Sequence, residues 1–80
     1  MDKKVTVVGK NLKKHRKEKN LTQERLASRS GYHRTYISAL ERGRANPTVN
    51  TLANLSQQLG IQIHDLFDDT KRNGLINNHA

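Results

Sequence analysis

The sequence predicts an all-α protein, a compact bundle of five helices. Apolar residues recur at helical spacing along most of the chain, and no segment has the alternating pattern of a β-strand. Eighty residues suit a single small domain with a modest core. We therefore expect one folded domain over residues 1–68, followed by a polar, flexible tail over residues 69–80.

The expected helices follow from apolar stripes and from residues that begin or end helices. A frayed basic arm at residues 1–4 precedes a first helix over 5–19, which contains Gly9. A glycine inside a helix costs about 1 kcal/mol relative to alanine, although it allows close packing. Asn20 can end this helix in the left-handed conformation. The later helices, with their caps, are expected at 23–29 (Thr22), 34–42 (Gly43), 49–59 (Thr48 and Gly60) and 63–67.

Residues 22–43 are predicted to form two short helices joined by a tight turn at Gly31. In the second of these helices Ile37 and Leu40 turn inward, together with Tyr36 or Glu41. The free face near its N-terminal end carries an arginine and small hydrogen-bonding side chains: Arg34, Thr35 and Ser38. A helix with such a face can enter the major groove of DNA.

A resemblance to a known family rests on positions with fixed spacings over about residues 6–67. These positions are Leu12, Arg16, Leu21, Thr22, Gln23, Leu26, Ala27, Gly31, Tyr36, Ile37, Ser38, Leu40, Glu41, Arg42, Gly43, Pro47, Thr48, Leu52, Leu55, Leu59, Gly60, Leu66 and Phe67. The chain resembles the phage Cro/repressor type (XRE-like) of helix-turn-helix protein, which implies a lambda-repressor-like fold. The small size and the run at residues 34–38 look most like the controller proteins of restriction–modification systems.

The charge is distributed unevenly, with a formal net charge of +8. Residues 1–47 hold 13 Lys and Arg against 4 Asp and Glu, whereas residues 48–80 hold 2 against 3. A basic half beside a neutral half suggests one face for a polyanion such as DNA. The alternative is a solvated, lysine-rich surface with no partner.

Several other classes of function find no support in the sequence. There is no cysteine, no apolar run long enough for a membrane span and no signal peptide, so we expect a cytoplasmic protein. The histidines lack metal-ligand spacing, and no catalytic constellation or phosphate-binding glycine loop is present. We expect no enzyme activity, no metal, no cofactor and no small-molecule ligand.

The candidate base-contacting residues are Arg34, Thr35 and Ser38. Arginine can grip guanine O6 and N7 in a fork, although Arg34 could instead contact a phosphate. The methyl group of Thr35 suits thymine. The candidate contacts to the DNA backbone are Gln23, Tyr36, Arg42, Arg44, Asn46, Arg16 and His33. For Gln23 this role is implied by the resemblance.

Each of these residues has an alternative role, which for Arg42, Arg44 and Asn46 is a solvated loop with no contact to DNA. Tyr36 could pack in the core, and Gln23 could be only a tolerated first-turn residue. The resemblance implies an internal, exposed ion pair between Arg16 and Glu41, worth at most about 1 kcal/mol, although Arg16 could also contact phosphate. His33 is a poor N-cap, which leaves the start of its helix uncertain by about a residue, and it could be either a DNA contact or inert.

A dense apolar group near the end of the chain consists of Ile61, Ile63, Leu66 and Phe67. The resemblance implies a two-fold dimer interface here, with the two recognition helices about 34 Å apart on a palindromic site. The alternative is that all four residues close the core of one chain.

The leading functional hypothesis is a dimeric, sequence-specific transcriptional regulator that binds a palindromic operator. If the controller resemblance holds, it activates at one site and represses at another, including its own promoter. The alternative is an antitoxin, an interaction protein that binds a toxin and regulates its own operon.

Overall fold

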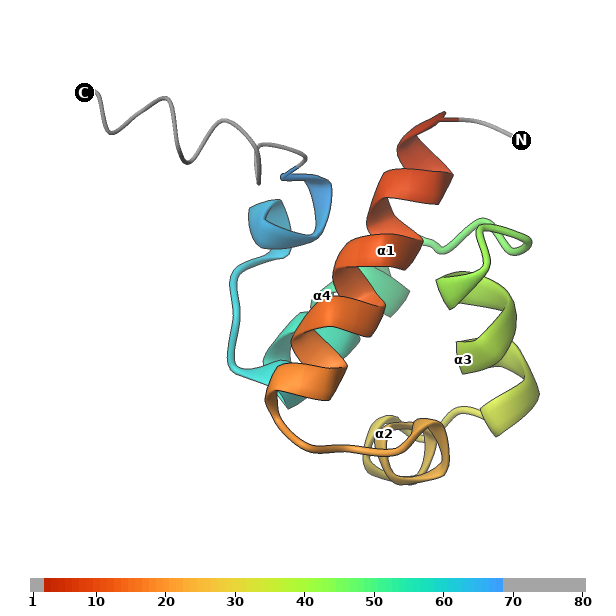
Figure 1. Ribbon diagram of the computed structural model, residues 1–80, viewed down its shortest axis with the longest axis vertical. Coiled ribbons are helices and arrows are strands. Elements are labelled where there is room, and N and C mark those ends of the chain that lie inside the picture. Colours follow the sequence, from red (N-terminus) through yellow and green to blue (C-terminus); the bar gives the residue numbers. More distant parts are fainter. Residues whose placement is uncertain (1–2, 69–80) are drawn as a thin grey trace.

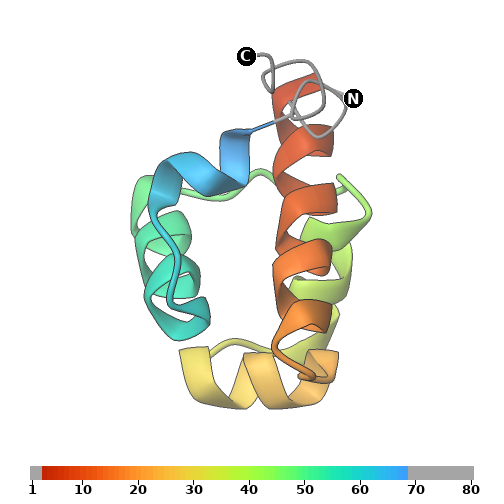
Figure 2. The ribbon, with the colours of Figure 1, turned by 60° about the vertical axis from the view of Figure 1, so that its left-hand side comes forward.

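The computed structural model describes residues 3–68, so the predicted tail at 69–80 lies outside the described residues, as do residues 1–2. The described chain forms α1 Lys3–Glu18, α2 Gln23–Ser30, α3 Arg34–Glu41, α4 Val49–Leu59 and the 3₁₀-helix η1 Ile63–Phe67 (Figure 1). None of its residues is in a strand, which confirms the all-α prediction. Figure 2 shows α1 and α3 on one side, α4 and η1 on the other, and α2 across one end.

The helix boundaries are set locally, by the predicted caps. The side-chain oxygens of Thr22 and Thr48 accept the third backbone N–H of α2 and of α4, each at 3.0 Å. Asn20 has φ +60°, the left-handed conformation expected after α1. The expected frayed arm is wrong for Lys3 and Lys4, because α1 already begins at Lys3 and its first turn is held by buried Val5.

The fifth element is a 3₁₀-helix, which corrects the predicted bundle of five α-helices to four α-helices and one 3₁₀ segment within residues 3–68. Its five residues are too short for more than about one turn of α-helix. A capping box begins it, since Asp65 accepts the backbone N–H of Gln62 at 2.9 Å. The Asn11 amide of α1 then donates to the carbonyls of Leu66 and Asp68, which fixes η1 against α1.

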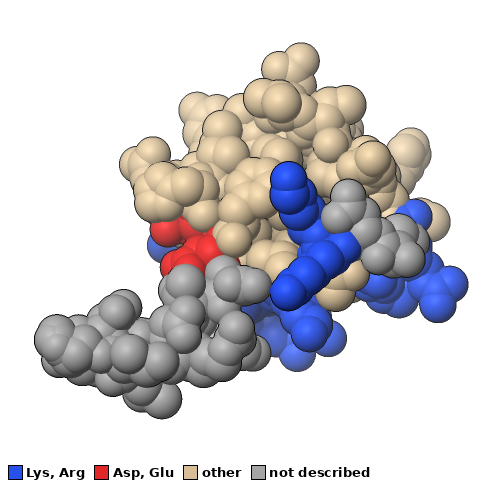
Figure 3. Space-filling view, turned by 90° about the horizontal axis from the view of Figure 1, so that it is seen from above, with Lys and Arg blue, Asp and Glu red and all other residues tan. Residues whose placement is uncertain are grey.

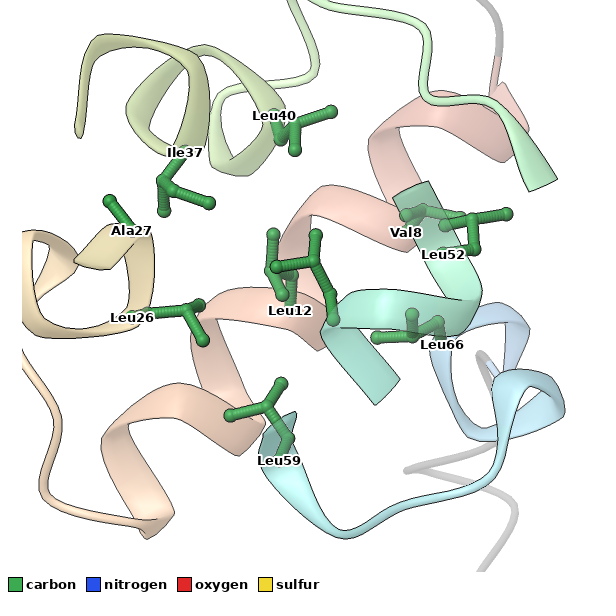
Figure 4. Packing of buried hydrophobic residues seen from close by; sticks show 10 residues of the cluster. Val8, Leu12, Leu26, Ala27, Ile37, Leu40, Leu52, Leu59 and Leu66 are labelled. Atoms are coloured by element: carbon green, nitrogen blue, oxygen red, sulfur yellow. The ribbon is translucent and has the colours of Figure 1, made fainter. Parts of the chain in front are cut away.

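The core is a single apolar cluster contributed by all five elements (Figure 4). Its fully buried large side chains are Leu12, Leu26, Ile37, Leu55, Leu59 and Leu66. The predicted inward turn of Ile37 and Leu40 is confirmed, and both side chains point from α3 toward α1 and α2. Burial of this apolar surface is what holds the short helices in place, since helices of eight residues are not stable alone.

Gly9 lets α1 and α3 approach more closely than side chains would allow. A Cβ atom built on Gly9 would collide with the carbonyl oxygen of Leu40 and would lie 2.9 Å from that of Glu41. The contact explains a glycine in the middle of a helix, where it lowers helix propensity. It also brings α1 against the C-terminal end of α3.

We expect Gly9→Ala to lower the free energy of unfolding by about 1–3 kcal/mol, because the backbone of α3 must move away from the new methyl group. Urea denaturation measures the change, with Lys14→Ala on the exposed side of α1 as the control. A more stable Gly9→Ala protein, as helix propensity alone predicts, would contradict the close packing.

Candidate nucleic-acid interface

The two helices of the predicted motif meet at a tight turn. Gly31 has φ +81° and its N–H donates to Ala27, which ends α2. His33 then precedes α3 in an extended conformation, with no side-chain capping hydrogen bond. The helix therefore starts at Arg34 as predicted, and the imidazole of His33 is left exposed at the helix start.

The two faces of α3 differ as the sequence indicated. Ile37, Leu40 and Glu41 are buried. Arg34 and Thr35 are exposed, and Ser38, one turn later, is half-buried. The N-terminal end of α3 therefore presents these side chains to solvent.

A buried polar network joins α1, α2 and α3. The Nε atom of Arg16 donates to Glu41 Oε2 at 2.6 Å, and Arg16 Nη2 donates to Glu41 Oε1 at 3.0 Å. Gln23 Nε2 donates to the same Oε1 at 3.0 Å. The remaining Arg16 nitrogen, Nη1, donates to the carbonyl of Leu21 at 2.7 Å. One carboxylate thus holds residues from three helices.

The network corrects two expectations about Arg16. The ion pair was expected to be exposed, but Arg16 and Glu41 are only 7% and 9% exposed, because Gly9 lets α1 cover the end of α3. A contact between Arg16 and a phosphate was also expected. All three guanidinium nitrogens already donate inside the protein, so Arg16 is a structural residue here.

Gln23 occupies the first position of α2 and is half-buried. One of its amide hydrogens is held by Glu41, which fixes the side chain next to the free N–H groups of that helix end. This arrangement suits a contact to phosphate, because both the second amide hydrogen and the helix end can donate.

Two exposed arginines, Arg34 of α3 and Arg42 just after it, have partners that the sequence did not predict. Arg34 Nε lies 3.7 Å from Glu24 Oε2 of α2, and both side chains are more than half exposed. Arg42 Nη1 donates to Ser38 Oγ at 2.6 Å. The second contact joins residues four apart, a spacing visible in the sequence. The first joins two helices, so it depends on how they cross.

Tyr36 is half-buried and links α3 to the start of α4. Its ring packs edge-on against Tyr32, with ring centroids 5.2 Å apart. Its hydroxyl lies 3.4 Å from Thr51 Oγ1, which in turn lies 2.9 Å from Thr48 Oγ1. Of the two roles weighed for Tyr36, packing is the one this arrangement supports.

The loop after α3 adds basic and polar groups beside the same helix. Arg42, Arg44 and Asn46 are all exposed, and Gly43 turns the chain with φ +72°. Figure 3 shows Lys and Arg side chains gathered along one side of the molecule, with the visible Asp and Glu in a small separate patch. The described part of the protein therefore has a basic side that suits a polyanion.

Other kinds of site were sought in the described residues. Across residues 3–68, His, Asp and Glu side chains form no group of three that could hold a metal ion. No helix in that range is long and apolar enough to cross a membrane.

Comparison with known families and sequences places these features in context. Residues 12–66 match the family described as HTH_3, helix-turn-helix. A chain from Sinorhizobium fredii named as an uncharacterized HTH-type transcriptional regulator, y4dJ, is 50% identical over 64 residues, covering 80% of this chain and 83% of that one. The control protein C.BamHI from Bacillus amyloliquefaciens is 45% identical over 51 residues, covering 64% of this chain and 63% of its own.

Solved structures give the same result for the fold. The restriction–modification controller protein C.AhdI from Aeromonas hydrophila superposes with a TM-score of 0.76 at 35% identity, covering 79% of this chain and 96% of that one. The biofilm master regulator SinR, solved in complex with DNA, superposes with a TM-score of 0.73 at 34% identity, covering 76% and 98%.

We expect Glu41→Ala to lower the free energy of unfolding by about 3–5 kcal/mol, because it leaves the buried Arg16 guanidinium without its counter-ion. Urea denaturation measures the loss. Glu24→Ala removes an exposed carboxylate and should cost less than about 1 kcal/mol. Equal losses in the two variants would contradict the structural role of the buried pair.

Proposed function

This chain belongs to the XRE-like helix-turn-helix family, and on that premise we propose that it binds a palindromic operator as a homodimer and regulates transcription. The relatives named above include a transcriptional regulator and restriction–modification control proteins, to which the chain is close. The observation that carries the proposal is the N-terminal end of α3. There Arg34 and Thr35 are exposed on a helix whose opposite face is fixed by the core and by Glu41.

In the proposed complex α3 lies in the major groove with its N-terminal end toward the bases. Arg34 donates to a guanine, and Thr35 offers its methyl group to a thymine. Glu24 Oε2 lies 3.7 Å from Arg34 Nε, too far for a hydrogen bond, so both Nη groups of the guanidinium remain able to donate. The hydroxyl oxygen of Ser38 accepts a hydrogen bond from Arg42 Nη1. We therefore assign both residues to the edge of the contact between α3 and the bases.

Contacts to the sugar–phosphate backbone would fix the position of α3 in the groove. We assign them to Gln23 and the start of α2, and to the loop residues Arg42, Arg44 and Asn46. Exposed His33 lies at the start of α3 and is a further candidate. Neutralising several phosphates should make the affinity fall steeply with salt concentration.

We further propose that η1 forms the two-fold interface. We assign two of the four predicted interface residues to this surface. Leu66 is fully buried and Ile61 packs against the core of its own chain, so we remove both from the predicted interface. Ile63 and Phe67 are 38% and 45% exposed and lie on the same 3₁₀-helix.

The proposed mode of regulation rests on the similarity of this chain to controller proteins. We propose that the amount of protein sets occupancy of the operator through dimerisation, with activation at one site and repression at another. The chain's own promoter would be among its targets.

Arg34→Ala should relax the base preference at one position in each half-site, at a cost of about 1–3 kcal/mol for the preferred base. Selection of binding sites from random duplexes measures this preference. Arg29→Ala, which removes an exposed arginine from the other helix of the motif, is the control and should leave the preference intact. An unchanged preference in Arg34→Ala would refute base reading by Arg34.

Phe67→Asp should convert the dimer to single chains at low micromolar concentration, because a carboxylate would be buried between two copies. Sedimentation equilibrium measures the mass. Val49→Asp places the same charge at another exposed apolar residue, 73% exposed, and should leave the dimer intact. A wild-type protein that is monomeric both free and on DNA would reject the proposed interface.

A further inference from the structure

We propose that three lysines of α1 form a second contact surface for DNA, which binds the backbone of duplex outside the half-site read by α3. These residues, Lys10, Lys13 and Lys17, are called the lysine stripe. The inference rests on the proposed function and extends it, because it assigns a partner to a face of α1 that the helix-turn-helix motif does not use.

The lysine stripe follows one line along the outside of α1. Its members are spaced at i, i+3 and i+7, which places them on one face of a helix, and all three are exposed. The line spans about 10 Å at 1.5 Å per residue. A stripe of this length that lies along the DNA axis spans about three phosphates of one strand, which rise about 3.4 Å each along that axis.

Contacts between α1 and its neighbours show which side the stripe occupies. Gly9 lies against the carbonyls of Leu40 and Glu41, and a Cβ atom on Gly43 would lie 3.4 Å from Thr6. The residues one turn after Gly9 and Thr6 are Lys13 and Lys10, so the stripe continues the edge of α1 that faces α3. On the opposite edge of α1 the Asn11 amide donates a hydrogen bond to the carbonyl of Leu66 in η1.

The stripe is held at a fixed position relative to the proposed phosphate contact at Gln23. Arg16 lies in the same two turns of α1 as Lys13 and Lys17, and its guanidinium is bonded to Glu41. Glu41 also accepts the amide of Gln23. A phosphate bound at the start of α2 therefore lies at a defined distance from the lysines, and the same strand can continue onto them.

The charges of the stripe are not neutralised within the described part of the chain. Among residues 3–68 no carboxylate forms an ion pair with any of the three lysines, and Glu18, the acid of α1, lies against His15 instead. Lys13 and Lys17 are like charges one turn apart, an arrangement that is unfavourable in a free helix. A row of phosphates would relieve this repulsion.

The test compares two duplexes that carry the same selected operator. One ends at the outer edges of the half-sites, and the other extends about ten base pairs, one helical turn, on each side. We expect the wild-type protein to bind the longer duplex more tightly. With three lysine contacts per chain, that advantage should fall roughly fortyfold per chain between about 50 and 200 mM salt.

The variant Lys13→Gln/Lys17→Gln, which keeps only Lys10 of the stripe, should lose most of the advantage of the longer duplex and keep the wild-type base preference. The matched control is Lys19→Gln/Arg29→Gln, which removes the same charge near α4. Lys19 lies near the end of α4, because its Nζ is 3.7 Å from the position that a Cβ atom on Gly60 would take. Arg29 lies at the end of α2, which is joined to α4 by a hydrogen bond from the Asn54 amide to the carbonyl of Ser30. This control should keep the advantage of the longer duplex.

Two results would overturn the inference while leaving the proposed function intact. One is equal binding of both duplexes by the wild-type protein. The other is an equal loss in the two double variants, which would show that only net charge matters. A wild-type protein with no preference for the operator over random duplex would refute the proposed function, and this inference with it.

Discussion

The buried ion pair between Arg16 and Glu41 is the constraint on which the rest of the structure depends. Glu41 is the last residue of α3, where the helix dipole disfavours a negative charge, and it is nearly inaccessible to water. Both features are unfavourable unless a cation and several donors meet the carboxylate. Arg16 and Gln23 supply three donors, and Gly9 provides the close approach that brings α1 to the site. The pair therefore contributes orientation more than stability, since it fixes how α3 is rotated about its own axis.

The orientation of α3 decides which side chains face outward. One residue corresponds to about 100° of rotation, so a shift by a single residue would exchange buried Ile37 for Ser38. The core alone could tolerate small rotations of so short a helix, because apolar packing is not directional. A carboxylate that must hydrogen-bond to a guanidinium does not tolerate such rotations. The exposed end of α3 with Arg34 and Thr35 is thus held by a contact at the helix's other end, two turns away.

The described surface is divided among three kinds of chemistry. Basic side chains dominate α1, α2 and the loop after α3, whereas α4 has no charged residue at all. Large exposed apolar side chains occur on η1 and at the start of α4. This separation is consistent with a protein that uses one side for a polyanion and another for a second copy of itself. It also explains why the formal charge of the whole chain says little about either surface until the helices are placed.

The sequence by itself determined the local features: the helix limits apart from the start of α1, the caps at Thr22 and Thr48, the left-handed Asn20, and the inward and outward faces of α3. These depend on backbone conformation and on periodicity within a few residues, which the order of side chains specifies directly. Only the tertiary structure decided that Leu66 closes the core, that the Arg16–Glu41 pair is buried, and that Glu24 lies near Arg34. Each of these depends on the distance between separate helices. That distance is set by the packing of whole helices, beginning with the contact at Gly9.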